Sequence, residues 1–310
     1  MADIRHQAVM VREVLEYLQP APGDVIVDAT VGSAGHALAI WEGISPGGRL
    51  IGIDQDPLAL ARARSRLPDP AVTLVEANFR RLAEILDNLG LAAVDGALFD
   101  FGVSAEQLEY LERGFAFRRE APLDMRMSPR LPTTAADLIR MLSEEELARL
   151  IREYGEERWA RRIARHIVAQ RQHSPITTTT ALAALVTAAI PPPARSTRIH
   201  PATRTFQALR ITVNDELNAI AEGLHAAVHR SNITARIVAL SYHSLEDRMV
   251  KETFRKLAKP CRCPPLLPTC QCEGVPLIRI ITRKPVTPSD QEVAANPRSR
   301  SAKLRAAERV

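Results

Sequence analysis

A glycine-containing segment near the start of the chain reads Asp28-Ala29-Thr30-Val31-Gly32-Ser33-Ala34-Gly35-His36, and it follows the β-branched run Val25–Val27. The run favours a short buried strand, and the segment leads into a helical pattern at residues 37–41. Strand patterns recur at 50–53, 72–75 and 94–99, separated by helical patterns at 58–66 and 82–89. Continuous apolar strands that alternate with helices predict a parallel sheet covered on both faces.

The rhythm changes further along the chain. Helical patterns dominate residues 107–205, where Ser143 before three glutamates is typical of a helix start. A helix is also expected at 156–170, and strand patterns return at 235–242 and 277–281. We therefore predict an α/β fold: a Rossmann-like domain in two parts, residues 1–106 and 206–310, interrupted by a helical insertion at 107–205. The insertion is the candidate substrate-recognition domain.

The composition is that of a soluble globular protein. Of the 310 residues, 46% are hydrophobic and 25% charged, no window approaches the roughly 18 apolar residues of a membrane span, and the first six residues lack the apolar core of a signal peptide. We therefore expect a cytoplasmic protein that does not contact the membrane. The net charge of +5 suits either a polyanionic partner or simple solubility. Residues 297–305 carry four cations and no acid, so we expect a basic C-terminal tail.

Acidic residues end three of the predicted strands: Asp28, Asp54 and Asp100. Ligands of open α/β sheets bind at the carboxyl ends of the strands. Each aspartate alone is better explained as a helix cap, but three at successive strand ends favour a nucleoside pocket. Phe79, after the third strand, either covers the adenine face of the ligand or belongs to the core.

The loop chemistry separates two nucleotide cofactors. A dinucleotide needs G-x-G-x-x-G for its pyrophosphate, whereas this loop has only Gly32 and Gly35. The carboxylate of Asp28 would repel a pyrophosphate and would suit the ammonium group of a methionine moiety. Asp54 is placed to accept ribose hydroxyls, a role that both cofactors share. The pattern favours S-adenosylmethionine.

Ten segments along nearly the whole chain resemble the RsmH (MraW) family of 16S ribosomal RNA cytosine-N4 methyltransferases. They are His6–Val9, Asp28–His36, Gly52–Pro57, Asp95–Ser104, Arg113–Phe117, Pro122–Met127, Tyr154–Arg158, His200–Ala208, Ser241–Arg248 and Asn296–Ser301. The resemblance implies that S-adenosylmethionine methylates the exocyclic N4 amine of a cytidine in 16S rRNA of the small ribosomal subunit. It implies cofactor contacts at Ala34, Gly35, His36, Asp54, Phe79, Asp100 and Gln107, to which the loop chemistry adds Asp28.

The chain departs from the family pattern twice. The family commonly has two adjacent glycines where this chain has Ala34-Gly35, and paired serines where it has Ser104-Ala105. The amide of Ala34 is available to a cofactor if its φ is negative. Ser104 keeps its hydroxyl and is a candidate substrate contact.

Methylation of an amine whose lone pair is delocalised needs an acceptor that orients it. Asp100, or a nearby backbone carbonyl, is the first candidate for this role. His243, after the strand at 235–242, is a candidate base or base-positioning group, and a structural histidine near a helix start explains it equally well. Ser244 with Asp247 is expected to cap the helix that follows.

The expected macromolecular partner is 16S rRNA. Arg126 and Arg204 lie in loop-like segments and are candidate RNA contacts, whereas arginines along 158–165 are better explained as a solvated helix face. The oligomeric state stays open, with a homodimer as one option.

Cys261, Cys263, Cys270 and Cys272 lie in one short stretch. Four thiolates so close together predict a structural zinc site, with reduced thiols as the equally weighted alternative.

Three other functions compete with the rRNA methyltransferase. They are a related amino methyltransferase that acts on DNA or protein, an RNA-binding assembly factor that keeps the fold without activity, and a dehydrogenase. The acid at each strand end disfavours the assembly factor, and the missing pyrophosphate loop makes the dehydrogenase the weakest.

Overall fold

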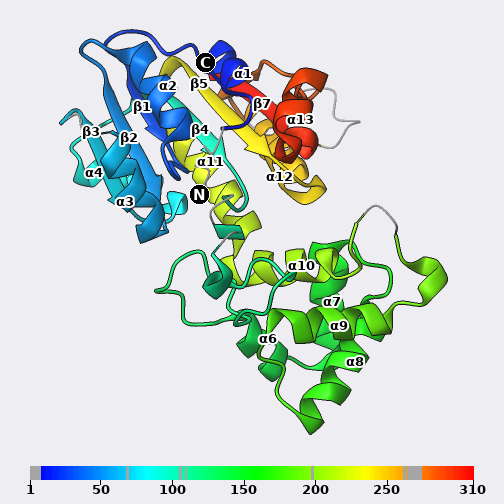
Figure 1. Cartoon of the computed structure of the whole chain (residues 1–310). Coiled ribbons are helices and arrows are strands. Elements are labelled where there is room, and N and C mark those ends of the chain that lie inside the picture. Colours follow the sequence, from blue (N-terminus) through cyan, green and yellow to red (C-terminus); the bar gives the residue numbers. More distant parts are fainter. Residues whose placement is uncertain are drawn as a thin grey trace. The chain divides into compact units, whose positions relative to one another are not determined.

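The computed structural model describes residues 8–67, 70–104, 107–108, 110–196, 199–260, 263 and 274–310. The chain divides into two compact units: unit 1 comprises Met1–Gly102 and Leu217–Val310, and unit 2 comprises Val103–Glu216 (Figure 1). The insertion predicted at residues 107–205 lies within unit 2. Among the described residues, no helix is long and apolar enough to cross a membrane.

Unit 1 is built on one seven-stranded sheet whose strand order is β3-β2-β1-β4-β5-β7-β6. The strands are β1 (Val25–Asp28), β2 (Arg49–Asp54), β3 (Val72–Glu76), β4 (Val94–Asp100), β5 (Ser231–Ser241), β6 (Ile278–Ile280) and β7 (Lys303–Arg309). The first five are parallel, and β7 runs antiparallel to both β5 and β6. The strand order reverses at β1, between β2 and β4, so a ligand is expected at the carboxyl end of β1.

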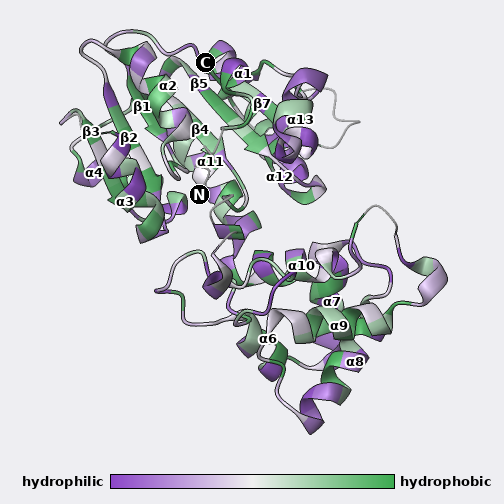
Figure 2. Ribbon diagram, viewed as in Figure 1, coloured by the Kyte–Doolittle hydropathy of each residue, from purple (hydrophilic) through white to green (hydrophobic). Residues whose placement is uncertain are grey.

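Helices cover both faces of this sheet because successive side chains of each strand point to opposite sides. Leu50, Leu98 and Leu240 pack on the face covered by α1 (Val11–Leu18), α2 (Gly35–Ile44) and α3 (Pro57–Arg66). Ile51, Phe99 and Ala239 pack on the face covered by α4 (Leu82–Asn88), α11 (Glu216–His229) and α12 (Ser244–Ala258). The central strands are accordingly hydrophobic along their length (Figure 2). The predicted fold class, a Rossmann-like α/β sheet with a helical insertion, is confirmed.

The prediction of a basic C-terminal tail is wrong. After α13 (Asp290–Ala295) and the short 3-10 helix η4 (Pro297–Ser301), the chain enters β7 and fills the place between β5 and β6. Leu304 and Ala306 are fully buried there. Arg305 is only 7% exposed, and its Nε donates to Oδ1 of Asp247 on α12 at 2.6 Å. The charge of Arg305, which the sequence predicts to be solvent-exposed, is therefore buried in an ion pair with Asp247.

Unit 2 is helical. Its helices are α6 (Ala135–Met141), α7 (Glu144–Gly155), α8 (Ala160–His173), α9 (Thr179–Ala189) and α10 (Thr203–Asn214), joined in part by the 3-10 helices η2 (Leu111–Arg113) and η3 (Pro192–Ala194). Ser143 and Glu146 form the predicted capping box of α7. The helix expected at 156–170 begins at Ala160, and Ile163 and Ile167 are buried on its inner face. These residues belong to a core of their own.

Candidate active site

The three strand-end aspartates lie on neighbouring parallel strands, as predicted. Asp28 ends β1, Asp54 ends β2 and Asp100 ends β4. Because β1 pairs with both β2 and β4, Asp28 is the central member of the group. This is the carboxyl edge of the sheet at the point where the strand order reverses.

The loop after β1 is held by side chains of this group. Asp54 accepts hydrogen bonds from the amides of Gly32 at 3.0 Å and Asp56 at 2.8 Å. Thr30 accepts one from the amide of Asp100 at 2.6 Å. The loop therefore ties the ends of β2 and β4 together before α2 begins.

The backbone at Ala34 differs from the expectation. Its φ is 67°, in the left-handed region, where it precedes the first residue of α2. Glycine adopts this conformation without cost, whereas a Cβ makes it unfavourable by roughly 1–2 kcal/mol. Gly35, next to it, packs so closely that an added Cβ would lie 2.8 Å from the Cβ of Ala8. The condition of a negative φ at Ala34 is therefore not met.

The surroundings of two of the carboxyl groups, the buried Asp28 and the half-buried Asp54, disfavour the charged form. Burial raises the pKa of Asp28 to about 7, although His36 and the amide of Thr30 oppose the shift. Burial also raises the pKa of Asp54 to about 6, against the hydrogen bonds from Asp56 and Gly32. A cationic ligand placed here would relieve this cost, because it favours the ionised carboxylates. A pyrophosphate would increase it.

His36 and Tyr242 both point to Asp100. Nε2 of His36 lies 3.4 Å from Oδ2 of Asp100, and the hydroxyl of Tyr242 donates to Oδ1 at 2.7 Å. Burial works against the His36 cation, but Asp100 and Asp28 together raise the pKa of His36. Burial and Asp100 raise the pKa of Tyr242 well above its usual value, so its hydroxyl keeps its proton and stays a donor. Tyr242 was not singled out from the sequence, although it lies in the matched segment Ser241–Arg248.

Neither ring nitrogen of His36 has a hydrogen-bond partner within the described part of the chain, although both are buried. The 3.4 Å approach to Asp100 is an ion-pair distance without hydrogen-bond geometry. A buried polar group of this kind normally has a partner. The site therefore suits a ligand that carries both positive charge and hydrogen-bonding groups.

The comparisons with known proteins agree with this chemistry. The model of the MraW methylase family matches residues 3–310. The chain belongs to the MraW methylase family. Curated relatives named "Ribosomal RNA small subunit methyltransferase H" include those of Geotalea daltonii, 52% identical over 100% of this chain and 100% of the relative, and Geobacter sulfurreducens, 55% identical over 98% and 99%. The one from Symbiobacterium thermophilum is 53% identical over 97% of this chain and 95% of its own.

The residues at the sheet edge fit S-adenosylmethionine, the cofactor that the loop chemistry favours. Its sulfonium and ammonium groups are cationic, and its ribose offers two hydroxyls. The buried Asp28 and the half-buried Asp54 present carboxyl groups that such a ligand satisfies, and burial raises their pKa values to about 7 and 6. These two carboxyl groups decide the fit, because they attract a cation and repel a phosphate.

Phe79 lies in the short 3-10 helix η1 (Phe79–Arg81), which follows β3. Its ring packs against those of Phe99 and Phe101, with centroids 5.7 Å apart in each pair. Gly223 on α11 leaves room for it, since a Cβ there would lie 2.6 Å from Phe79. Phe79 is partly buried and packs against the core, and its role at an adenine stays a prediction.

His243 is the N-cap of α12 in this methylase. Its Nδ1 accepts from the amide of Glu246 at 3.4 Å, and its Nε2 lies 2.9 Å from Oε1 of the same, fully buried Glu246. The other oxygen, Oε2, accepts from the amide of Tyr242 at 2.7 Å. The expected cap by Ser244 and Asp247 is therefore wrong: His243 and Glu246 form it, and Asp247 pairs with Arg305.

Ser104 and Gln107 lie in unit 2, where they bond each other. The amide of Ser104 donates to Oε1 of Gln107 at 3.0 Å, and the amide of Gln107 donates to Oγ of Ser104 at 3.1 Å. This reciprocal pair is a capping box. The cofactor contact at Gln107 and the RNA contact at Ser104 stay predictions.

Arg126 organises its own loop in unit 2. Its Nε and Nη2 donate to Asp124 at 2.8 Å each, and its Nη1 donates to the carbonyls of Pro129 and Leu131. Four of the five N–H groups of a guanidinium are thus directed inward. Arg204, by contrast, is exposed at the start of α10, where its Nη1 donates to the carbonyl of Glu156 at 3.3 Å and lies 3.8 Å from Oε2 of Glu157. Of the two predicted RNA contacts, Arg204 is the one with more N–H groups left to offer.

The predicted zinc ligands fall almost entirely outside the described residues. Only Cys263 of the four cysteines is described. A structural zinc at Cys261, Cys263, Cys270 and Cys272 stays a prediction.

Proposed function

We propose that the chain transfers a methyl group from S-adenosylmethionine to the exocyclic N4 amine of a cytidine in 16S rRNA of the small ribosomal subunit. The proposal rests on the cluster of His36, Asp100 and Tyr242 at the end of β4, within a chain of the MraW methylase family. The relatives' printed name supports ribosomal RNA of the small subunit as the substrate class.

Bound S-adenosylmethionine would supply an electrophilic methyl group on a cationic sulfur. The residues proposed to hold it are Asp28 for its ammonium group, Asp54 for the ribose hydroxyls, and Phe79 for the adenine. Gly35, His36, Asp100 and Gln107 complete the proposed set of cofactor contacts, whereas Ala34 is left out of it because its φ is positive.

Asp100 is proposed to act on the amine of the cytosine. Its carboxylate would accept a hydrogen bond from the N4 amine, which turns the nitrogen lone pair toward the methyl group and stabilises the positive charge that develops there. As the new carbon–nitrogen bond forms and the carbon–sulfur bond breaks, one proton must leave nitrogen. A carboxylate at that position can accept it or pass it to solvent.

Tyr242 and His243 are proposed to position Asp100. The Tyr242 hydroxyl fixes one carboxylate oxygen, while His243 fixes Glu246, which in turn holds the backbone of Tyr242. This chain of contacts makes His243 a positioning residue, and a role as the base itself is the second candidate.

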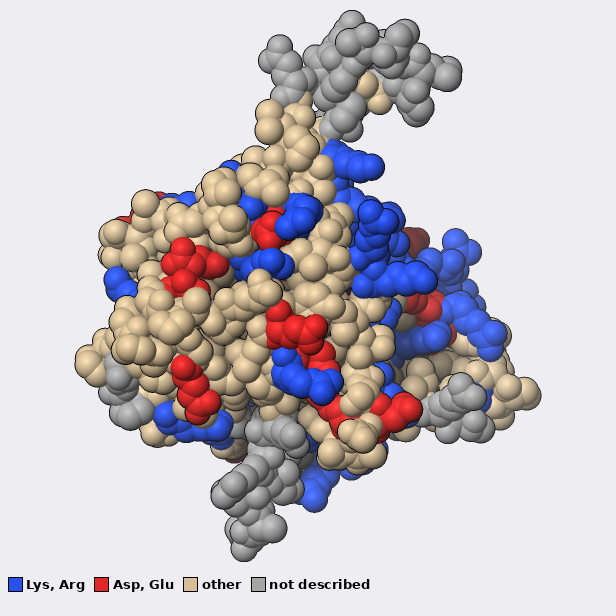
Figure 3. All heavy atoms as spheres, turned by 90° about the horizontal axis from the view of Figure 1, so that it is seen from above, with Lys and Arg blue, Asp and Glu red and all other residues tan. Residues whose placement is uncertain are grey.

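The charge of the surface is compatible with an RNA substrate. Figure 3 shows lysine and arginine side chains as well as acidic ones at the surface. The formal net charge is +5, and an excess of basic groups attracts a phosphate backbone.

The direct test is transfer of a labelled methyl group to unmethylated 30S particles, free 16S rRNA and DNA, followed by nucleoside analysis. We expect N4-methylcytidine in rRNA and no product from DNA. Asp100→Asn, which keeps the shape of the side chain, should lower turnover at saturating cofactor by 100-fold or more. Label in DNA or in added protein, or full activity of Asp100→Asn, would contradict the proposal. An assembly factor without activity would label none of the three.

Three finer proposals accompany it. A zinc ion at the four cysteines is tested by metal analysis of the purified protein, where less than one zinc per chain argues against it. A homodimer is tested by sedimentation. The cytoplasm, where small ribosomal subunits are made in bacteria, is tested by fractionation.

A further inference from the structure

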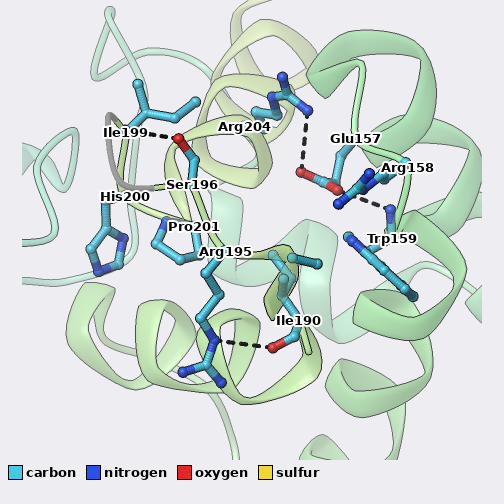
Figure 4. A pocket seen from close by; sticks show the side chains of 11 residues that line it. Glu157, Arg158, Trp159, Ile190, Arg195, Ser196, Ile199, His200, Pro201 and Arg204 are labelled. Carbon is cyan, nitrogen blue, oxygen red and sulfur yellow. Dashed lines mark hydrogen bonds and ion pairs between the residues drawn. The ribbon is translucent and has the colours of Figure 1, made fainter. Parts of the chain in front are cut away.

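A pocket of about 290 Å³ opens in unit 2 beside the start of α8 (Figure 4). Its walls come from three places: the turn between α7 and α8, the segment after α9, and the residues that precede α10. The residues that line it include Arg158, Trp159, Ile190, Arg195, His200 and Arg204. The volume lies at the lower end of the range for small-molecule sites, which suits a single nucleotide.

The pocket lies where two of the family-matched segments, Tyr154–Arg158 and His200–Ala208, pack closely against each other. Gly155 lies so close to the start of α10 that an added Cβ would be 2.6 Å from the carbonyl oxygen of Arg204. Nε2 of Gln207 donates to the carbonyl of Tyr154 at 2.9 Å, and Arg204 bonds that of Glu156. Any side chain at position 155 would push the two segments apart and open the pocket.

The charge of the pocket is positive. Three arginines face one glutamate, Glu157, which is 3.8 Å from Arg204 and also accepts the amide of Trp159 at 2.9 Å. Arg195 is anchored by one bond from Nε to the carbonyl of Ile190 at 3.1 Å. Each anchored guanidinium keeps further N–H groups, and such a fork matches the geometry of a phosphate.

The aromatic side chains of the pocket point to a base as well as a phosphate. Nε1 of Trp159 is buried, and within the described residues it has no hydrogen-bond partner. Figure 4 shows the nitrogen-bearing end of this indole turned toward the middle of the pocket. The guanidinium of Arg158 lies 5.5 Å from the centre of the Trp159 ring, and the exposed His200 ring is backed by Phe117 at 4.7 Å. Bases stack on such groups, and they carry acceptors that an indole N–H can reach.

We propose that this pocket binds one unstacked nucleotide of single-stranded RNA. The base of this nucleotide would stack beside Trp159 and accept a hydrogen bond from the indole N–H of that residue. The phosphate of the nucleotide would bind to Arg195 and Arg204. A bare phosphate would leave the indole and Ile190 unused, and a duplex has no free base to insert. The pocket lacks the carboxylates of the strand ends, so its role is binding and not methyl transfer. The inference rests on the proposed function only in taking RNA as the substrate.

The test uses the two tryptophans of the chain, Trp41 and Trp159. In the Trp41→Phe variant, Trp159 is the sole indole, and a short single-stranded RNA should quench its fluorescence while the same RNA in a duplex should not. Trp159→Leu should weaken single-strand affinity by about 5- to 150-fold, the range measured for one base–aromatic stack. Arg204→Gln and Arg195→Gln should each reduce the slope of log affinity against log salt by about 0.7.

Arg161→Gln is the matched control, because Arg161 is exposed on α8 in the same unit and does not line the pocket. It should leave the quenching unchanged. Cofactor binding and the unfolding temperature show whether each variant is folded. RNA binding without quenching, or pocket variants that bind RNA as the control does, would overturn the inference. Saturation by a free mononucleotide as tightly as by RNA would overturn it too. If the protein quenches with RNA but methylates no rRNA, the proposed function fails and the pocket stands.

Discussion

The hydroxyl of Tyr242 donates a hydrogen bond of 2.7 Å to Oδ1 of Asp100, across 142 residues of sequence. The pKa of Tyr242 is raised by burial and by Asp100, so this hydroxyl stays protonated over the working pH range. It therefore acts on Asp100 as a fixed donor. A carboxylate held in one orientation has less freedom to lose when it meets the substrate amine.

Tyr242→Phe removes that donor and keeps the ring. A hydrogen bond to a charged group contributes about 1.5–3 kcal/mol, so we expect kcat/KM for methyl transfer to fall roughly 10- to 150-fold. The measurement is steady-state transfer to 30S particles, with cofactor affinity from calorimetry. Tyr17→Phe, which removes a hydroxyl from α1, should stay within about twofold of the parent. An unchanged kcat/KM in Tyr242→Phe would show that Asp100 does not depend on this bond.

The sheet and the acids at its edge can be predicted from the sequence, because each corresponds to a local pattern. Val25–Asp28 and its counterparts each read as a short apolar run ended by an acid, and strand direction then places the acids together. The side chains that contact Asp100 cannot be predicted in this way. His36 and Tyr242 meet it through the pairing of β1, β4 and β5, which no local pattern encodes.

The last strand shows why a local pattern also misleads. The tail was predicted from residues 297–305, which contain four cations and no acid, as is typical of a solvated segment. The strand that these residues enter, β7, is buried because Asp247 neutralises Arg305 and Glu308 pairs with Arg236 and Arg279. Those partners lie far away in sequence, so the charges alone predicted a tail. The left-handed backbone of Ala34 was missed because the residue type argues against it.

The pKa of Asp28 predicts how the stability of unit 1 depends on pH. Burial raises this pKa from 3.8 to about 7, so the folded state binds a proton that the unfolded chain has already released. The group's contribution is fully present below pH 4 and is lost as pH rises through 7. At about 1.4 kcal/mol per pKa unit, Asp28→Asn should be more stable than the parent by about 4 kcal/mol at pH 8, and by little at pH 4.

The measurement is urea unfolding without cofactor, in a Trp159→Phe background so that Trp41 on α2 reports unit 1 alone. Asp290→Asn, which changes an exposed carboxylate on α13, should show no such pH dependence. A gain for Asp28→Asn that is equal at pH 4 and pH 8 would mean that the carboxyl group is not protonated by burial.

The backbone of Ala34 predicts an unusual response to glycine. Ala34→Gly relieves a left-handed conformation that costs roughly 1–2 kcal/mol, but it removes a buried methyl group that contributes about 0.8 kcal/mol. The net change should lie between zero and a gain of about 1 kcal/mol. Ala39→Gly, within α2, should instead lose about 1 kcal/mol. The free energies of unfolding of the two variants decide it: equal losses at both positions would contradict the φ of Ala34.

His243 separates positioning from base catalysis. His243→Ala removes the side-chain cap of α12 and the ion-pair contact with Oε1 of the fully buried Glu246, so we expect a loss of about 1–2 kcal/mol in stability and a roughly tenfold loss of turnover. Asparagine is a good N-cap, so His243→Asn should recover the stability and most of the turnover. A general base contributes about 100- to 10,000-fold. If His243→Asn is as stable as the parent yet loses 100-fold or more in turnover, His243 is the base and the positioning role is wrong.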